Sequence, residues 1–174
     1  MRHLEQHRQA VGGLLGRAGI VITDTEWDGL EMTDLGLGHF EVEGLSLVVY
    51  ENNDRYCAKE LVLLPWQTCP EHRHPPVGGD PGKMETFRVR VGEVYLHVEG
   101  EPSPSPRARV PRGKEAYYAG APREVVLRPG EQFTIPPNTR HWFQAGADGA
   151  VVSEFSSTSR DESDVFSDPA VRRV

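Results

Sequence analysis

Short apolar segments separated by turn-forming residues are the feature that most limits how this chain can fold. From Ile20 onward, apolar and polar side chains alternate over short runs that Gly, Pro and Asp interrupt repeatedly. Alternation puts successive side chains on opposite faces of a strand, and the interrupting residues favour turns. We therefore expect strands at residues 40–42, 45–51, 58–64, 85–91, 93–98, 124–127, 132–135, 141–145 and 150–155. Many short strands with regular turns predict an all-β fold built as a sandwich or barrel.

The start of the chain follows a different pattern. Apolar residues recur there at helical spacing, on one face: Leu4, Val11, Leu14, Leu15 and Ala18. We therefore expect an N-terminal helix at 1–22, packed on the barrel or on a second subunit, and a barrel with a C-terminal tail at 23–174. The proline-rich segment 99–111 is expected to be an exposed loop or an irregular sheet edge, and the polar tail after Asp161 is expected to cover the barrel mouth.

Charge and cysteine content exclude several classes of protein. The net charge of −7 disfavours binding to nucleic acid or to anionic membrane surfaces, since both reward basic patches. No apolar run reaches the ~20 residues that a membrane span needs, and the first residues lack the apolar core of a signal peptide. Cys57 and Cys69 are too few for a disulfide framework, so we expect free thiols and a cytoplasmic protein.

One segment gathers metal-binding residue types. His72 and His74 are separated by one residue, so a strand would place both imidazoles on the same face. After a Gly-rich loop, Glu85 begins an alternating row with Phe87 and Val89, which we interpret as the inward row of a strand. A buried carboxylate needs a partner, and a metal ion would supply it.

A second segment offers a fourth ligand. His141 begins a predicted strand directly after the turn Pro136-Pro137-Asn138, and it shares a face with Phe143. Three neutral imidazoles with one carboxylate suit Mn²⁺, Fe²⁺, Co²⁺, Ni²⁺ or Zn²⁺ and leave coordination positions open for a substrate. His97, which alternates with Leu96 and Val98, is instead expected to be a surface residue.

The two segments resemble the paired motifs of cupins. Glu85 and Gly92 keep the spacing of the first motif, although the gap between His74 and Glu85 is longer than usual. Gly130, Pro136 and His141 match the second motif, with Asn138 where Gly is usual. Because Asn tolerates a left-handed turn, that exchange costs little. The resemblance implies a single, jelly-roll-like cupin β-barrel.

The chain is more specifically similar to the D-lyxose isomerase family of cupins. Four blocks carry this resemblance: CPEHRHP at 69–75, GKMETFRV at 82–89, PGEQFTIPPNTRHWFQAG at 129–146 and SEFSS at 153–157. The resemblance implies a homodimer, a Mn²⁺-dependent site, and isomerisation of the monosaccharide D-lyxose to D-xylulose. Interconversion of D-mannose and D-fructose is implied as a secondary activity.

Aldose–ketose isomerisation moves a proton between C2 and C1, so it needs proton-transfer groups. Glu154 is the candidate base, because it alternates with Val152 and Ser156 and is expected to face inward. Lys83 shares the face of Glu85 and is a candidate for stabilising a developing oxyanion. Asp164, in the tail, is a candidate for holding substrate hydroxyls.

Two other functions are compatible with the same ligands. An Fe(II)-dependent cupin dioxygenase also uses histidines with a glutamate, and a non-catalytic sugar-binding cupin would keep the metal without turnover. Lys83 and Glu154 favour the isomerase, because a dioxygenase does not need proton-transfer groups. The sequence leaves open the native metal, the preferred sugar, and the choice between an enediol and a hydride-shift mechanism.

Overall fold

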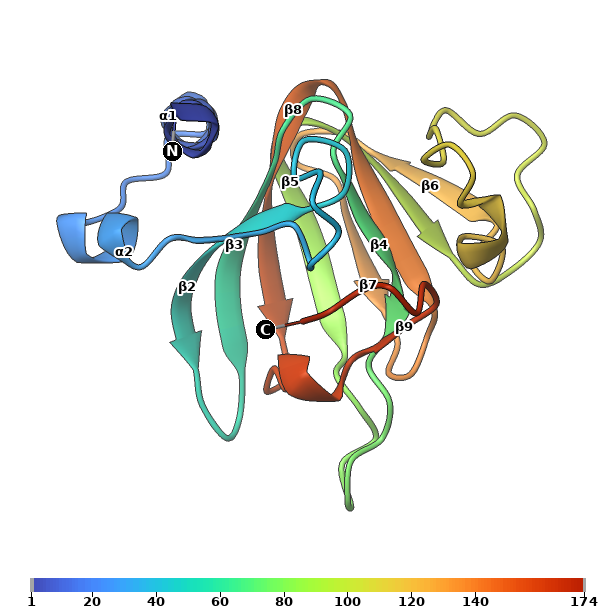
Figure 1. The fold of residues 1–174 in the computed structure, drawn as a ribbon. Coiled ribbons are helices and arrows are strands. Elements are labelled where there is room, and N and C mark those ends of the chain that lie inside the picture. Colours follow the sequence, from blue (N-terminus) through green and yellow to red (C-terminus); the bar gives the residue numbers. More distant parts are fainter. Residues whose placement is uncertain (1, 174) are drawn as a thin grey trace.

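Two long antiparallel strands form the spine of the protein (Figure 1). The structure is a computed structural model that describes residues 2–173. β5 (Glu85–Val98) and β8 (His141–Ser156) pair from one end to the other. β6 (Arg123–Leu127) and β7 (Gln132–Ile135) line the free edge of β5. β3 (Cys57–Leu63) and β4 (Thr68–Arg73) both pair with the other edge of β8. β2 (Leu45–Asn52) and then β1 (Glu31–Thr33) follow beside β3, and β9 (Val165–Phe166) pairs with β4.

The inward side chains of this curled sheet make the main core. Leu47, Leu61, Val152 and Val89 occupy one continuous row across four strands, and all four are buried. Burying one such aliphatic side chain stabilises the fold by about 1.5–3 kcal/mol. The apolar alternation read from the sequence is thus the inner face of the barrel, and the prediction of an all-β fold is confirmed.

β5 and β8 are each one continuous strand, whereas the sequence predicted four separate strands over these residues. β5 passes through Gly92, where the pairing with β8 shifts register. Gly92 has φ of 78°, and a Cβ there would overlap the carbonyl oxygen of Gly149 on β8. The glycines therefore permit a bulge with close backbone contact rather than a chain reversal, which is why both strands continue.

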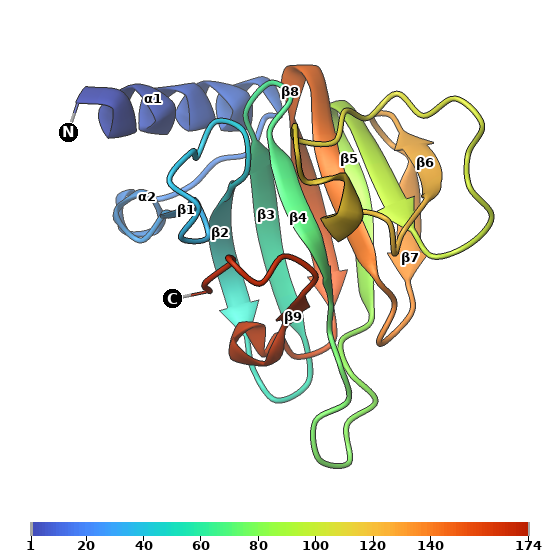
Figure 2. The same ribbon diagram turned by 45° about the vertical axis from the view of Figure 1, so that its right-hand side comes forward.

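Helix α1 (Arg2–Arg17) packs on the outer face of the sheet (Figure 2). Val11, Leu14 and Leu15 are buried against Val62 and Val151. Within the described residues, no helix is long and apolar enough to cross a membrane.

The segment between α1 and β2 departs from the prediction. Helix α2 (Asp24–Asp28) was not expected, and it begins at a capping box in which Thr23 and Glu26 exchange hydrogen bonds. The strand predicted at 40–42 is wrong, because these residues form a turn closed by a hydrogen bond from the Val42 amide to the His39 carbonyl. β1 lies where no strand was predicted.

His97 is buried, so the expectation of a surface position is wrong. Its ring stacks on Trp142 with centroids 3.9 Å apart, and Nε2 lies 3.1 Å from Glu124. The long segment after β5, which includes the 3-10 helix η1 (Glu115–Tyr117), folds over this outer face, while the 104–107 stretch stays exposed as predicted. Alternation identifies the outer face of a strand but does not reveal whether a distant loop covers it.

We expect His97 to make stability depend on pH. Burial lowers the pKa of His97 below its ordinary value of about 6.5, outweighing the nearby Glu124. Below that value the unfolded chain binds a proton that the folded chain resists, so stability is lost as pH falls. The free energy of unfolding, measured by urea at about pH 7 and pH 5, should decrease less in His97→Gln than in wild type. Equal decreases would contradict this.

Candidate active site

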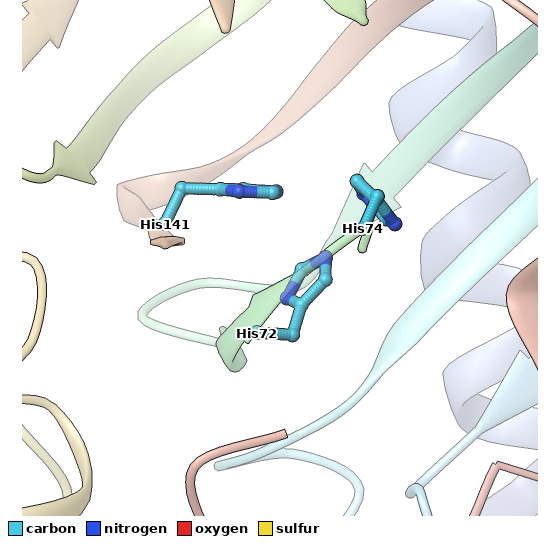
Figure 3. A group of neighbouring side chains, drawn as sticks. All are labelled: His72, His74 and His141. Carbon is cyan, nitrogen blue, oxygen red and sulfur yellow. The ribbon is translucent and has the colours of Figure 1, made fainter. Parts of the chain in front are cut away.

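Three histidine rings converge at one end of the barrel (Figure 3). One ligand atom from each of His72, His74 and His141 lies within 4.8 Å of the other two, and all three side chains are buried. His72 on β4 and His141 on β8 are direct partners in the antiparallel pairing, and His74 follows one residue after the end of β4. The register of β4 and β8 therefore brings together histidines that are almost seventy residues apart in sequence.

Each ring is held through its Nδ1 atom. Nδ1 of His72 lies 2.8 Å from the carbonyl oxygen of Pro70, and Nδ1 of His141 lies 2.9 Å from that of Thr139. A carbonyl can only accept, so Nδ1 carries the proton in both rings. In neutral imidazoles the remaining Nε2 atoms then present lone pairs, the state that a metal ion requires.

The loop between His74 and Glu85 explains the departure from the usual spacing of cupin residues. Val77 and Asp80 exchange backbone hydrogen bonds, which closes a small hairpin that projects from the barrel. The chain returns at Gly82, where φ is 100° and a Cβ would overlap the carbonyl oxygen of His74. The extra residues therefore leave and re-enter at the same place, so Glu85 still contacts His74 and His141, and Lys83 still contacts Glu85.

Asn138 joins the second motif to the first. It has φ of 57°, which confirms the left-handed turn predicted for it. Its amide donates to the carbonyl of His74 at 3.2 Å, and its side-chain oxygen accepts from Arg73 at 2.6 Å. These two hydrogen bonds hold the turn before His141 against the end of β4, next to His72 and His74.

Glu85 lies beside two of the three histidines. Its Oε1 atom is 2.8 Å from Nε2 of His141 and 3.3 Å from Nε2 of His74. Within the described part of the chain, Nε2 of His141 is buried without a hydrogen-bond partner of good geometry. A buried imidazole nitrogen without a hydrogen-bond partner, next to a carboxylate oxygen, offers two ligand atoms that a cation would satisfy. The residues present therefore fit a divalent metal.

The electrostatics of the centre also favour added positive charge. Burial alone would lower the pKa of His74, but Glu85 and a hydrogen bond to Asp164 raise it to about 9. Burial likewise opposes ionisation of Glu85, yet Lys83 and His74 hold its pKa well below the usual range. Without a metal, a proton on His74 balances the carboxylates, and metal binding would displace that proton.

Lys83 links Glu85 to Glu154. Its Nζ lies 2.7 Å from Oε2 of Glu85 and 2.5 Å from Oε1 of Glu154, and each of the three side chains is at most 5% exposed. Although burial lowers it, the two carboxylates raise the pKa of Lys83, so the ammonium stays charged. Glu154 faces inward next to the histidine centre, as its alternation on β8 suggested.

Asp164 reaches the centre from the tail, just after the 3-10 helix η2 (Asp161–Ser163). Its Oδ1 lies 2.5 Å from Nδ1 of His74. The side chain thus orients a histidine, although the sequence suggested contact with substrate hydroxyls. Carboxylates that bind the second nitrogen of a ligand histidine fix the ring and raise its basicity.

Replacing Asp164 by Asn should weaken Mn²⁺ binding about 10- to 100-fold, because a neutral amide holds His74 less firmly and makes it a poorer donor. Isothermal titration of metal-stripped protein with MnCl₂ measures this. Asp168→Asn is the matched control, since Asp168 is a buried tail carboxylate that binds Lys114 at 2.8 Å instead of a histidine. Equal affinity in wild type and Asp164→Asn would contradict this role.

Six of these residues line one cavity of about 410 Å³, counted with its open mouth: His72, His74, Lys83, Glu85, Glu154 and Asp164. Its apolar wall comes from β2, β3, β5, β8 and the tail, and includes Leu47, Leu61, Phe87, Phe143 and Phe166. Three charged lining residues were not predicted from the sequence: Lys59, Asp161 and Arg173. Lys59 alternates with Cys57 and Leu61 on β3, so an inward lysine in an apolar row was a signal that the sequence did contain.

A family model and two similar proteins indicate the same family for this chain. A family model described as D-lyxose isomerase matches residues 18–174. The D-lyxose ketol-isomerase of Cohnella laeviribosi is 62% identical over 167 residues, which cover 96% of this chain and 91% of that protein. The D-lyxose/D-mannose isomerase of Thermosediminibacter oceani is 58% identical over 171 residues, covering 98% of this chain and 94% of that protein.

Solved structures confirm the fold. The L-ribose isomerase of Cellulomonas parahominis, solved with L-ribose, superposes with a TM-score of 0.82 at 20% identity, covering 98% of this chain and 93% of that one. An RmlC-like cupin from Shewanella frigidimarina superposes with a TM-score of 0.50 at 17% identity, covering 78% of this chain and 89% of that one. The all-β prediction of a cupin barrel with an N-terminal helix is therefore confirmed.

Proposed function

The chain belongs to the D-lyxose isomerase family, and we propose that it converts D-lyxose to D-xylulose at the three-histidine centre. As a member of that family it is an aldose–ketose isomerase. The observation that carries the proposal is the contact of Lys83 with both Glu85 and Glu154, because it places proton-transfer groups directly beside the candidate metal ligands.

We assign the metal to His72, His74, His141 and Glu85. A divalent ion held there would supply a Lewis acid and a template for neighbouring oxygens of the open-chain sugar. Mn²⁺ is the proposed ion, on the family resemblance, and Co²⁺, Zn²⁺, Fe²⁺ and Ni²⁺ suit the same donors. The charged residues that line the cavity include more carboxylates than cations: Glu85, Glu154, Asp161 and Asp164 against Lys59, Lys83 and Arg173. The carboxylates alone would repel the electron-rich oxygens of a sugar, and a bound divalent cation would attract them.

Glu154 is the proposed base. Lys83 and Lys59 both approach its Oε1 atom, at 2.5 Å and 3.8 Å. Within residues 2–173, no ion pair engages Oε2, which is the oxygen available to take the C2 proton and return it to C1. Lys83 stays charged beside this oxygen pair and would stabilise negative charge that develops on the substrate.

Substrate range is the finer part of the proposal. D-Lyxose is proposed as the preferred sugar and D-mannose as a secondary one, consistent with the names of the two curated relatives. We also propose a cytoplasmic homodimer, as the family resemblance implied. Light scattering of the purified protein would then give about twice the 19.4 kDa mass of the chain.

An anaerobic panel of aldoses tests the function. Mn²⁺-loaded protein is incubated with D-lyxose, D-mannose and L-ribose, and ketose formation is measured by chromatography, with the chelated protein as the control. We expect ketose from D-lyxose at the highest rate without O₂. Turnover that requires O₂ would support the dioxygenase instead, and metal-dependent binding without ketose would support a non-catalytic sugar-binding cupin.

A further inference from the structure

A chain of alternating charges runs from the histidine centre to the tail. Glu85, Lys83 and Glu154 are joined by contacts of 2.7 Å and 2.5 Å. Beyond Glu154 the series continues through Lys59 to Asp161, and Asp161 contacts Arg173 at 2.6 Å. Every link is short except the two that involve Lys59, where both distances are 3.8 Å.

Lys59 is a buried ammonium with unused hydrogen-bonding capacity. Its side chain is 5% exposed, and 3.8 Å exceeds hydrogen-bond range to either carboxylate. Its hydrogen bond within the described chain is to Oγ of Ser159, at 3.3 Å. An ammonium has three donors, and burying a charge without partners is costly. Lys83, in contrast, contacts two carboxylates at 2.7 Å and 2.5 Å, so Lys59 is the lysine with more donors left for a ligand.

Asp161 supplies the complementary acceptor. One of its oxygens accepts from Oγ of Ser159 at 2.5 Å, and the other pairs with Arg173. Although burial opposes ionisation, Lys59 and Arg173 lower the pKa of Asp161, so it is a carboxylate at neutral pH. The Ser159 hydroxyl already bridges the two groups, because it accepts from Lys59 at 3.3 Å and donates to Asp161 at 2.5 Å. A substrate hydroxyl would join this bridge by accepting from a further donor of Lys59 and donating to a remaining lone pair of the Asp161 carboxylate.

The strand order fixes where such a hydroxyl lies relative to the reaction. Lys59 on β3 is the direct partner of Glu154 on β8, and β5, which carries Glu85, pairs with the opposite edge of β8. Lys59 is therefore across Glu154 from Lys83 and Glu85. If C1 and C2 lie at the histidine centre, as the proposed function requires, the opposite end of the open-chain sugar extends toward Lys59.

We propose that Lys59 and Asp161 bind the sugar hydroxyls farthest from the reacting carbons, those on C4 and C5. This inference rests on the proposed function and adds the part of the site that recognises the non-reacting end of the substrate. Lys59 and Asp161 are thus substrate-binding residues, and their contribution to kcat/KM depends on the hydroxyl they contact.

Deoxygenated sugars test the proposal in the wild-type enzyme. The Mn²⁺-loaded protein is assayed with D-lyxose and with its 4-deoxy and 5-deoxy derivatives. Loss of a hydroxyl that binds a charged pair should lower kcat/KM about 10- to 100-fold for at least one derivative. Equal kcat/KM for all three sugars would overturn the proposal without any variant being made.

The variant Lys59→Met sharpens the test. It should lower kcat/KM for D-lyxose while leaving the poorer deoxy sugar almost unaffected, so that the two sugars become equivalent within about 3-fold. Asp161→Asn should have the same effect on the ratio. If Lys59→Met lowers kcat/KM for all three sugars by one common factor, Lys59 acts through Glu154 or through folding, and the proposal fails.

Lys114→Met is the matched control, since Lys114 pairs with Glu43 and Asp168 outside the cavity. It should leave the ratio between the sugars as in wild type. Metal content is measured for every variant to show that the centre is loaded. Wild-type protein that does not isomerise D-lyxose at all would contradict the proposed function, whereas conversion without discrimination contradicts only the role of Lys59 and Asp161.

Discussion

Replacing Glu154 by Gln is expected to lower kcat for D-lyxose isomerisation about 10³-fold, within the 10²–10⁴-fold range that a general base contributes. The amide has nearly the same shape as the carboxylate but cannot accept the C2 proton. Because the histidines and Glu85 are unchanged, the variant should still bind one metal ion. KM should change little, since the base acts mainly in the transition state.

Steady-state kinetics in D₂O measures this effect and its mechanism together. Wild type should incorporate solvent deuterium into the ketose product, and Glu154→Gln should not exchange at a measurable rate. Glu60→Gln is the matched control, because Glu60 is also a buried glutamate on this sheet but faces outward, where it accepts from Oγ of Ser153 at 2.9 Å. An unchanged kcat in Glu154→Gln would remove Glu154 as the base, and product without deuterium would favour a hydride shift.

Replacing His141 by Ala is expected to abolish metal binding and activity together. His141 is fully buried, and its Nε2 faces Glu85 and the other two histidines. Alanine removes a donor and leaves Glu85 beside a gap, so the affinity for Mn²⁺ collapses. Turnover should then fall to that of the chelated wild type, a loss of at least about 10³-fold.

Metal analysis after dialysis, together with the ketose assay, checks this expectation. His97→Gln is the control for loss of a buried histidine, since His97 stacks on Trp142 outside the cavity. It should keep its metal and its activity at neutral pH. Full metal content in His141→Ala would show that His141 is not a ligand.

Much of the fold followed from the sequence because it depends on local alternation. The inward rows of β5 and β8 could be recognised from Glu85, Phe87, Phe143 and Val152 without knowing what they contact. Chain reversals were harder to locate, because Gly92 is equally compatible with a turn and with a bulge. Only the close approach of β5 and β8 decides between them.

The candidate site was predictable where a motif kept its spacing and unpredictable where the tail closes the barrel. His72, His74 and His141 stand in recognisable motifs, and the structure brings them together. Asp161 and Arg173 line the cavity through long-range contacts that no periodicity encodes. The contact of Asp164 with His74, ninety residues apart, is of the same kind, so its part in holding a histidine could not be deduced from sequence.

The most direct test of the central claim is a metal-reloading titration with the ketose assay. Metal-stripped protein is titrated with Mn²⁺ under anaerobic conditions, and D-xylulose formation from D-lyxose is followed against bound metal. Activity should rise in proportion to bound Mn²⁺ and reach its maximum at one ion per chain. Full activity of the metal-free protein, or saturation with metal without any D-xylulose, would contradict a sugar isomerase that works at the three-histidine centre.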